Sequence, residues 1–294
     1  MDRVLEYEIP SEYDGANITT VLKQHFKIST NLIKDLKKYK EGIQVNGEHK
    51  RVVDLAAKGD ILKITIRDTA SENIVPTDIP LDIVYEDEDV LVINKPSNMP
   101  THPSMGNYEN SLANGVMYYY KSKGEERVFR AVNRLDKDTS GLMAVAKNSY
   151  IHARLGEEIQ KKELKRKYMC IVCGDVERDG TVDAPIRRAD GSVINRIVAP
   201  DGQRAVTHYR VVKRYGEYTL LEMELETGRT HQIRVHFSHI GHPLAGDDMY
   251  GGHLNGIGRQ ALCCSKVLFV HPVTGHRIEL TCPPQDDMMA LVQL

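Results

Sequence analysis

Residues 133–142 read Asn-Arg-Leu-Asp-Lys-Asp-Thr-Ser-Gly-Leu, and they indicate more about this chain than any other stretch. The segment is polar and turn-forming, and it lies between Ala131-Val132 and an apolar strand predicted for Met143 to Ala146. Polar loops held between buried strands are common sites of function. The charged residues of this loop are therefore the first candidates for a site.

Two carboxylates, Asp136 and Asp138, lie in this loop beside Arg134 and Lys137. Because a nearby positive charge lowers the pKa of a carboxyl group, one of them can act as a nucleophile that stays ionised. The same spacing occurs more often in a charged surface turn. The residues alone leave both interpretations open.

A second polar segment, residues 227–237, reads Thr-Gly-Arg-Thr-His-Gln-Ile-Arg-Val-His-Phe. Thr230 is a plausible N-cap, and the apolar spacing predicts a short helix over residues 230–240. His231 and Arg234 lie three residues apart on it, to one side of the apolar stripe. Both side chains can therefore face a common cleft.

Metal binding is a weaker interpretation of the same region. Four histidines occur here: His231, His236, His239 and His242. No carboxylate stands at the position that a helical zinc motif requires, and two of the four flank the end of the predicted helix. Cys170 and Cys173 form a C-x-x-C pair inside an apolar run, without a second pair at zinc-ribbon spacing. We expect no metal and no redox site.

A basic run precedes a predicted strand in the middle of the chain. Its five cations lie within seven residues: Lys161, Lys162, Lys165, Arg166 and Lys167. With a net charge of −2, any nucleic-acid binding must rest on such local patches, although a run of this kind is more often a solvated helix end. Tyr168 follows, and it can pack, stack on a base or accept a proton in a cleft.

Composition indicates an ordinary globular protein. The chain has 294 residues, 41% hydrophobic and 27% charged, which suits one large domain with a smaller one attached. No apolar run approaches the ~18 residues that span a bilayer. Met1 to Pro10 lacks the basic and apolar regions of a signal peptide. We therefore expect a cytoplasmic protein without membrane contact, whose five cysteines stay reduced.

Residues 1–70 predict a small unit of their own. Apolar residues recur at helical spacing over residues 18–26 and 32–36, which predicts two short helices. The second helix carries three lysines away from its apolar stripe: Lys34, Lys37 and Lys38. Asn46-Gly47 is a hairpin signal, and a strand over residues 60–66 would close the unit.

Residues 71–80 have little periodicity and predict a linker to a second domain over residues 81–294. Val90 to Ile93 and Tyr218 to Leu225 read as strands, and Asn148 can cap a helix. Strands often follow strands directly here. The fold class expected is therefore α+β, with a mixed, mostly antiparallel sheet flanked by helices.

Five ordered motifs of the second domain resemble those of the RluA-type pseudouridine synthases. They are Val92 to Ser97 with His102-Pro103, Arg134-Leu135-Asp136 with Thr139 to Leu142, Lys167-Tyr168, Gly228 to His236, and Gly241-His242-Pro243 with Gly246-Asp247 and Tyr250-Gly251. The first unit resembles an S4 RNA-binding domain, with Gly42 to Gly47 at that family's glycine-valine-asparagine-glycine turn. The combination resembles the subgroup that modifies large-subunit ribosomal RNA.

The resemblance implies an enzyme that isomerises uridines in a structured RNA and needs no cofactor. It makes Asp136 the nucleophile and Arg234 the cation that pairs with it. It places Tyr168 under the target base, where it could take the C5 proton, and it makes Arg134 the residue that helps to displace that base. Eight further residues are expected to contact the RNA: Lys34, Lys37, Lys38, Lys165, Arg166, Lys167, Arg229 and His231. We expect a monomer whose partner is RNA, without a small-molecule cofactor.

One residue departs from the family pattern, because Asn133 stands where histidine usually precedes the loop arginine. Asparagine still donates and accepts hydrogen bonds, so we expect an intact loop with altered contacts. Three alternatives stay open: a pseudouridine synthase for tRNA, a non-catalytic RNA-binding or ribosome-assembly factor, and an N-glycosidase. The two-carboxylate arrangement that activates water in glycosidases is not evident, which disfavours the last.

Overall fold

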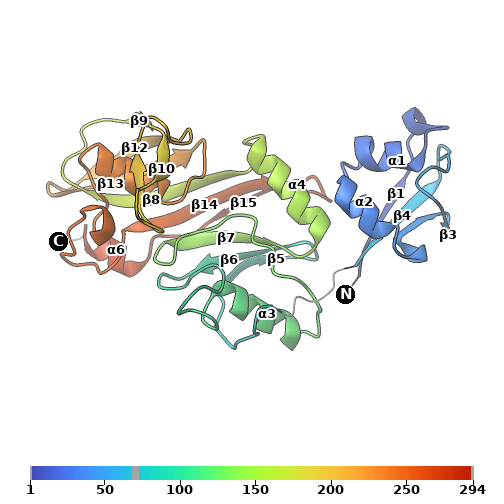
Figure 1. Cartoon of the computed structure of the whole chain (residues 1–294), viewed down its shortest axis with the longest axis horizontal. Helices are drawn as coiled ribbons and strands as arrows, with labels where there is room; N and C mark the ends of the chain where they lie inside the picture. The colour runs from blue at the N-terminus through green and yellow to red at the C-terminus, as the bar shows by residue number, and fades with distance from the viewer. Residues whose placement is uncertain (1, 68–72, 293–294) are drawn as a thin grey trace.

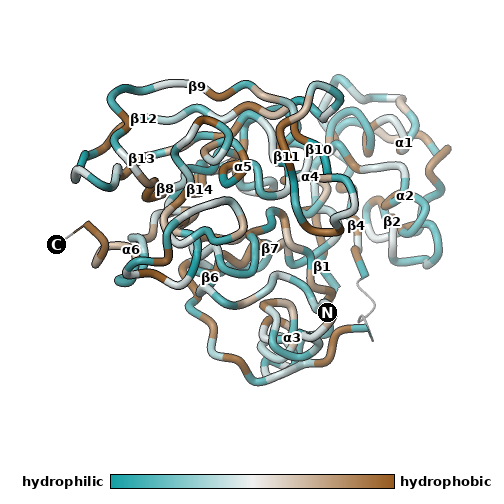
Figure 2. Tube along the Cα trace, turned by 60° about the vertical axis from the view of Figure 1, so that its left-hand side comes forward, coloured by the Kyte–Doolittle hydropathy of each residue, from teal (hydrophilic) through white to brown (hydrophobic). Residues whose placement is uncertain are grey.

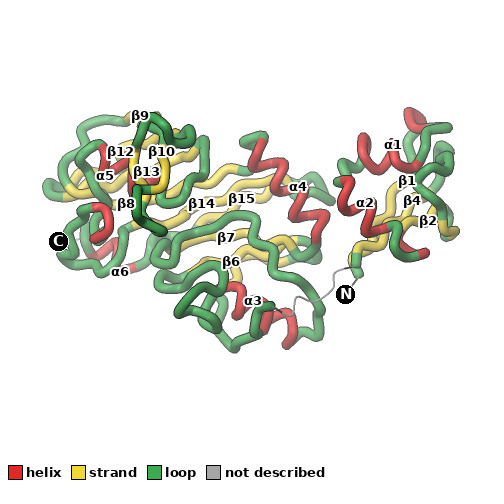
Figure 3. The backbone as a smooth tube through the Cα atoms, in the orientation of Figure 1, coloured by secondary structure: helices red, strands yellow, loops and turns green. Residues whose placement is uncertain are grey.

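A computed structural model describes residues 2–67 and 73–292 of the chain. It contains a small N-terminal sheet with two helices, and a larger sheet that carries the rest of the chain (Figures 1 and 3). Hydrophobic residues concentrate in the sheets and on the packed faces of the helices, whereas most surface loops are hydrophilic (Figure 2). Within the described residues, no helix is long and apolar enough to cross a membrane.

The N-terminal unit is built on a four-stranded antiparallel sheet in the order β1-β4-β2-β3. Its elements are β1 (Arg3–Glu8), α1 (Ile18–Thr20), a π-helical turn (Val21–His25), α2 (Thr30–Leu36), β2 (Ile43–Val45), β3 (Glu48–His49) and β4 (Ile61–Ile66). Asn46 and Gly47 both have positive φ, 51° and 84°, as the hairpin signal predicts. The likeness to an S4 domain stays a prediction.

The larger sheet has nine strands, and the predicted α+β class is confirmed. Along it lie β5 (Ile83–Glu86), β6 (Val90–Lys95), β7 (Ser140–Ala146), β14 (Leu262–Val270), β8 (Lys165–Cys173), β13 (Tyr218–Leu225), β12 (Val206–Arg214) and β9 (Gly180–Asp183), with β15 (Arg277–Thr281) beside β14. The pairing of β7 with β14 is parallel, and the other described pairs are antiparallel. The sheet is thus mixed and mostly antiparallel.

Helices and a small hairpin complete this domain. They are α3 (Leu112–Ser122), α4 (Ser149–Gln160), α5 (Gln232–His239) and α6 (Asp286–Ala290), with the hairpin β10 (Ile186–Arg188) and β11 (Arg196–Val198). Asn148 caps α4 as predicted, because its side chain accepts from the Ile151 N–H. The predicted N-cap at Thr230 is wrong: α5 begins at Gln232.

One glycine permits the strand pairing on which the site depends. Gly141, at the start of β7, has φ 110°, and a Cβ added there would lie 2.4 Å from the carbonyl oxygen of Cys264. No side chain fits at such an approach. The loop that precedes β7 is therefore held directly against β14.

The two parts of the chain touch near the N-terminus. The Arg3 guanidinium donates to both carboxylate oxygens of Asp89 at 2.8 and 2.7 Å, and the Tyr150 hydroxyl donates to the Phe26 carbonyl at 3.3 Å. The N-terminal unit accordingly lies beside α4 (Figure 1). The predicted linker falls partly outside the described residues, and Val75 contacts α3 by accepting from the Asn114 amide at 2.7 Å. The domain boundaries stay predictions.

Candidate active site

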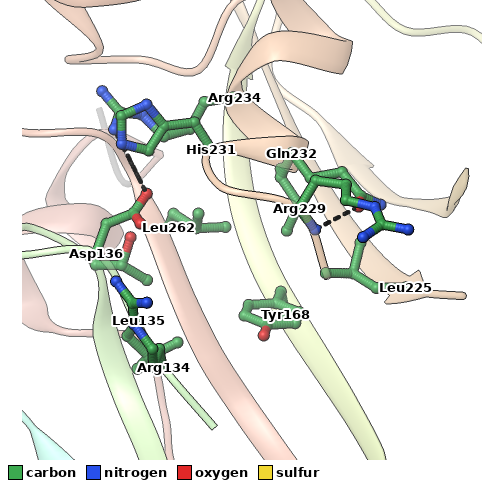
Figure 4. Close-up of a pocket in the computed structure, with 12 residues that line it drawn as sticks. Arg134, Leu135, Asp136, Tyr168, Leu225, Arg229, His231, Gln232, Arg234 and Leu262 are labelled. Carbon is green, nitrogen blue, oxygen red and sulfur yellow. Dashed lines mark hydrogen bonds and ion pairs between the residues drawn. The ribbon is translucent and has the colours of Figure 1, made fainter. Parts of the chain in front are cut away.

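Residues from four parts of the larger domain line one cavity (Figure 4). The cavity is lined by Arg134, Leu135, Asp136, Thr139, Tyr168, Leu225, Arg229, His231, Gln232, Ile233, Arg234 and Leu262. The three segments that the sequence singles out therefore meet, although they are far apart in the chain. All four predicted catalytic residues are among them.

The Asp136 carboxylate lies between the loop and α5. Its side chain is 30% exposed, and its Oδ2 lies 3.5 Å from Nη1 of Arg234 and 3.8 Å from Nε2 of His231. A neighbouring side chain fixes the loop, because the Leu135 carbonyl accepts from the Thr101 hydroxyl at 2.9 Å. A carboxylate faced by a cation and held by rigid backbone is pre-organised to act on a substrate.

Arg234 has a stronger partner than Asp136. Its Nε and Nη2 donate to the two carboxylate oxygens of Asp247 at 2.7 and 2.8 Å. Both side chains are buried, and the pair is bidentate. Burial lowers the pKa of Arg234, but the hydrogen bonds to Asp247 and the charge of Asp136 outweigh it and raise the pKa above its ordinary value. Asp247 thus aims a permanent cation at Asp136.

Tyr168 forms part of the cavity wall from β8. The residue is 4% exposed, and burial raises its pKa well above the ordinary value. The phenol therefore keeps its proton at neutral pH. Such a ring is suited to pack against a base, and it is a poor proton acceptor.

A buried lysine lies beneath the loop. Lys95 is fully buried, and its Nζ donates to the carbonyls of Pro96, Met99 and Lys137 at 2.7, 2.8 and 3.1 Å. Burial lowers its pKa to about 7, while the charges of Asp138 and Asp136 act in the opposite direction. The three bonds tie the loop after β6 to the loop that carries Asp136. The sequence motifs include Lys95 but do not indicate that it would connect these two loops.

Asn133 secures the other end of the same loop. Its Oδ1 accepts from the Ala144 N–H at 2.9 Å, and its Nδ2 donates to the Leu142 carbonyl at 3.4 Å. The side chain therefore pairs with β7 much as a neighbouring strand would. Asn133, which departs from the family pattern, therefore holds the loop against β7.

The predicted RNA-binding residues fall into three groups. Arg229 and His231 line the cavity or its mouth, beside the predicted catalytic residue Arg134. Lys34, Lys37 and Lys38 are exposed on α2 or just after it. Three lysines of the basic run pair with glutamates on or just after β13: Lys162 with Glu226 at 2.8 Å, Lys165 with Glu224 at 3.6 Å and Lys167 with Glu222 at 2.9 Å.

Sequence reasoning missed a second group of cations beside the cavity. Arg187, Arg188 and Arg196, on the β10–β11 hairpin, line a groove together with Arg229, and Arg187 is paired there with Asp190 and Asp201. Three arginines within ten residues were a signal that could have indicated it. Asp247 was also unassigned, since its role depends on a contact that the sequence does not specify.

The histidines after the second motif have structural partners. Both ring nitrogens of His236 are engaged, Nδ1 with the Thr207 hydroxyl and Nε2 with the Ala184 carbonyl, each at 2.9 Å. His242 Nδ1 lies 3.0 Å from the Cys173 carbonyl. Within residues 2–67 and 73–292, no three His, Cys, Asp or Glu side chains gather as metal ligands.

Comparison with known proteins identifies the family. A family model for RNA pseudouridylate synthase matches residues 89–239. RNA pseudouridine synthase YhcT of Bacillus subtilis (strain 168), named as uncharacterized, is 40% identical over 98% of this chain and 96% of its own length. The chain belongs to the RNA pseudouridylate synthase family. Ribosomal large subunit pseudouridine synthase D of Escherichia coli (strain K12) is 42% identical over 74% of this synthase and 72% of its own length.

Solved structures agree on the fold of the synthase. Human RNA Pseudouridylate Synthase Domain Containing 1 has a TM-score of 0.58 at 23% identity, covering 70% of this chain and 84% of its own. The synthase is an isomerase that converts uridine in RNA to pseudouridine, and the predicted RluA-type family is confirmed. The N-glycosidase and the non-catalytic binding factor are therefore set aside.

Proposed function

We propose that this synthase isomerises specific uridines of large-subunit ribosomal RNA and that Asp136 acts at C1′ of the target ribose. The observation that carries the catalytic assignment is the Asp136 carboxylate, held in a cavity with Arg234 Nη1 3.5 Å from its Oδ2. The choice of RNA is supported by relatives at about 40% identity whose names specify the large ribosomal subunit. Transfer RNA remains the rival substrate.

The reaction explains why a carboxylate suffices. The bond from C1′ to N1 breaks, the uracil turns within the site, and C1′ bonds to C5. C5 then loses a proton and N1 gains one, so atoms and electrons balance without an external reagent. Asp136 would attack C1′ or stabilise the positive charge that develops there. Arg234, itself fixed by Asp247, would face this carboxylate with a fixed positive charge.

Tyr168 and Arg134 would handle the base itself. Because the Tyr168 phenol keeps its proton, we assign it to packing against the extruded uracil and not to removal of the C5 proton. Arg134 is exposed at the mouth of the cavity. It would fill the space left by the flipped nucleotide, whose unstacking costs a few kcal/mol that contacts to the RNA backbone offset.

The RNA would bind across both parts of the chain. Arg229 and the arginines of the β10–β11 hairpin lie beside the cavity, and the exposed lysines of α2 give the N-terminal unit the character of an S4-like anchor. Asp136, Tyr168 and Arg234 all come from a single chain, which supports action as a monomer. We infer that it works in the cytoplasm.

Pseudouridine mapping tests this proposal. Total RNA is mapped from cells that lack the gene, and from the same cells complemented with the intact gene or with Asp136→Asn. Ribosomal sites should vanish and return only with the intact gene. Loss confined to tRNA sites would overturn the choice of substrate, and restoration by Asp136→Asn would overturn the role of Asp136.

A further inference from the structure

His231 contacts Asp136 from a backbone conformation that few non-glycine residues adopt. Its φ is 57° and its ψ is 20°, in the left-handed region, immediately before α5. The side chain makes no capping hydrogen bond to the helix. It lies in the cleft instead, next to Asp136 (Figure 4). Strained backbone retained at a site indicates that the side chain it positions has a use there.

Tyr250 contacts Nδ1 of His231, the ring nitrogen that faces away from Asp136. Its hydroxyl oxygen lies 3.0 Å from the backbone nitrogen of Arg196 and 2.8 Å from Nδ1 of His231. Since the Arg196 N–H can only donate, the phenolic hydrogen is free to donate to Nδ1. Burial raises the pKa of Tyr250, so the phenol keeps that hydrogen. Nε2 faces the Asp136 carboxylate, which can only accept, so the neutral ring that suits both neighbours carries its proton on Nε2 and accepts from Tyr250 at Nδ1.

The protonated nitrogen is the one that faces the reaction centre. Nε2 of His231 lies 3.8 Å from Oδ2 of Asp136, and Nη1 of Arg234 approaches the same oxygen to 3.5 Å. Both donors thus converge on Oδ2, and neither of these contacts involves Oδ1. The distances exceed those of full hydrogen bonds, but catalytic contacts often shorten when substrate binds.

Burial, together with two nearby arginines, favours the neutral form of the ring. Burial lowers the pKa of His231, and the charge of Asp136 opposes this effect. Arg234 and Arg196 lower the pKa further, while Asp247 raises it. A neutral ring with Nδ1 as acceptor is the only state in which Tyr250 can donate to it.

We propose that Tyr250 and His231 form a positioning relay that aims Nε2–H at Oδ2 of Asp136 and leaves Oδ1 to approach C1′. This inference rests on the proposed role of Asp136. The relay begins at the backbone of Arg196, on the β10–β11 hairpin beside the cationic groove. The hairpin and the reacting carboxylate are therefore joined by one chain of polar contacts.

The test compares variants that keep or lose the Nε2–H donor. Tyr250→Phe removes the hydroxyl, His231→Gln keeps an N–H donor at a similar reach, and His231→Gly removes the donor while relieving the left-handed backbone. Tyr118→Phe, at an exposed position on α3, is the matched control. The readouts are single-turnover tritium release from ribosomal RNA labelled at uridine C5, RNA affinity, melting temperature, and nitrogen-15 NMR of the histidine rings.

For Tyr250→Phe, the relay predicts a loss of rate without a loss of RNA binding. Tyr250→Phe should slow the single-turnover step by about tenfold and produce a mixture of His231 tautomers, with RNA affinity unchanged. His231→Gly should be slower still yet at least as heat-stable as the intact enzyme, and His231→Gln should recover part of the rate.

Other results would overturn the relay. Wild-type rates in both Tyr250→Phe and His231→Gly would do so, as would a ring proton on Nδ1 in the intact enzyme. Asp136→Asn in the same assay separates the two proposals. If it is inactive while the relay variants behave as wild type, only the relay fails; if it is active, the proposed role of Asp136 fails as well.

Discussion

The cavity around Asp136 and the N-terminal unit both present basic side chains, but they hold them in different ways. Arg234 is buried and makes two bonds to Asp247, and Lys95 is buried with three carbonyl partners. Lys34 and Lys37 on the N-terminal unit are exposed. Charge near the cavity is fixed by the fold, whereas the charge of these lysines on the N-terminal unit is exposed to solvent.

This contrast separates two demands on one enzyme. Stabilising charge at C1′ requires groups that are in place before the reaction and need no reorganisation. Holding a long, charged RNA requires cations that can release counterions over a wide surface. Substitutions in the two regions should accordingly have different effects. Those in the cavity should alter the reaction rate and the stability of the fold. Those of the exposed lysines on the N-terminal unit should alter RNA affinity and its salt dependence.

The largest effect on stability is expected from the buried pair. Asp247→Ala leaves the Arg234 guanidinium buried without its partner, which should lower the free energy of unfolding by about 3–5 kcal/mol and slow turnover. The matched control is Asp175→Ala, which breaks the exposed Arg214–Asp175 pair. Asp175→Ala should change the free energy of unfolding in urea by an amount near the limit of measurement. Similar losses in both variants would contradict the contrast.

Lys95 should show an intermediate effect. Lys95→Met removes the donor shared by three buried carbonyls, so we expect a loss of about 1–3 kcal/mol in unfolding free energy and a slower single-turnover step at unchanged RNA affinity. Lys137→Met, at an exposed position in the adjoining loop, provides the comparison. A normal rate in Lys95→Met would show that the loop holds its geometry without the lysine.

The pH dependence of the unfolding free energy tests the charge state of Lys95 directly. Burial lowers the pKa of Lys95 to about 7, so from pH 7 to about 10 the unfolded chain binds a proton there that the folded chain lacks. The cost of burying the charge is present in full below pH 7 and is relieved as pH rises. The unfolding free energy of the intact enzyme relative to Lys95→Met should therefore increase over this window. A constant difference would mean that Lys95 stays charged.

The smallest effects should come from substitutions of the exposed lysines on the N-terminal unit. Replacing Lys34 and Lys37 by alanine should reduce the slope of log affinity against log salt by about 1–2 and leave the single-turnover rate unchanged. Replacing Lys165 and Lys167 should change the slope less, because glutamates of β13 already neutralise them. Both slopes are measured by filter binding on the same RNA. Equal changes in slope for the two pairs of lysines would contradict the proposal that the N-terminal lysines bind RNA.

Local sequence signals predicted many elements of this molecule. The strand at Tyr218–Leu225 and the cap at Asn148 depend on neighbouring residues, and the structure has both. The strand Arg3–Glu8 was missed because it is held by pairing with β4, some 60 residues away. The N-cap at Thr230 was wrong because the left-handed backbone of His231 moves the start of α5.

The sequence predicted individual residues of the site but not the contacts between them. The motifs supplied Asp136, Tyr168 and Arg234, and the structure brings them to one cavity. Nothing local to Arg234 specifies that Asp247 would be its main partner, because that pairing depends on how the chain folds back after α5. The neutralisation of the β8 lysines likewise depends on which strand lies beside β8.

The most direct test of the central claim compares the purified enzyme with Asp136→Asn on large-subunit ribosomal RNA at equal bound fraction. Product is read by chemical mapping of pseudouridine after a single turnover. The account predicts that the variant binds the RNA as tightly as the intact enzyme and forms product slower by a factor on the order of ten thousand. Product formed at a comparable rate by Asp136→Asn, or binding lost in parallel with activity, would contradict it.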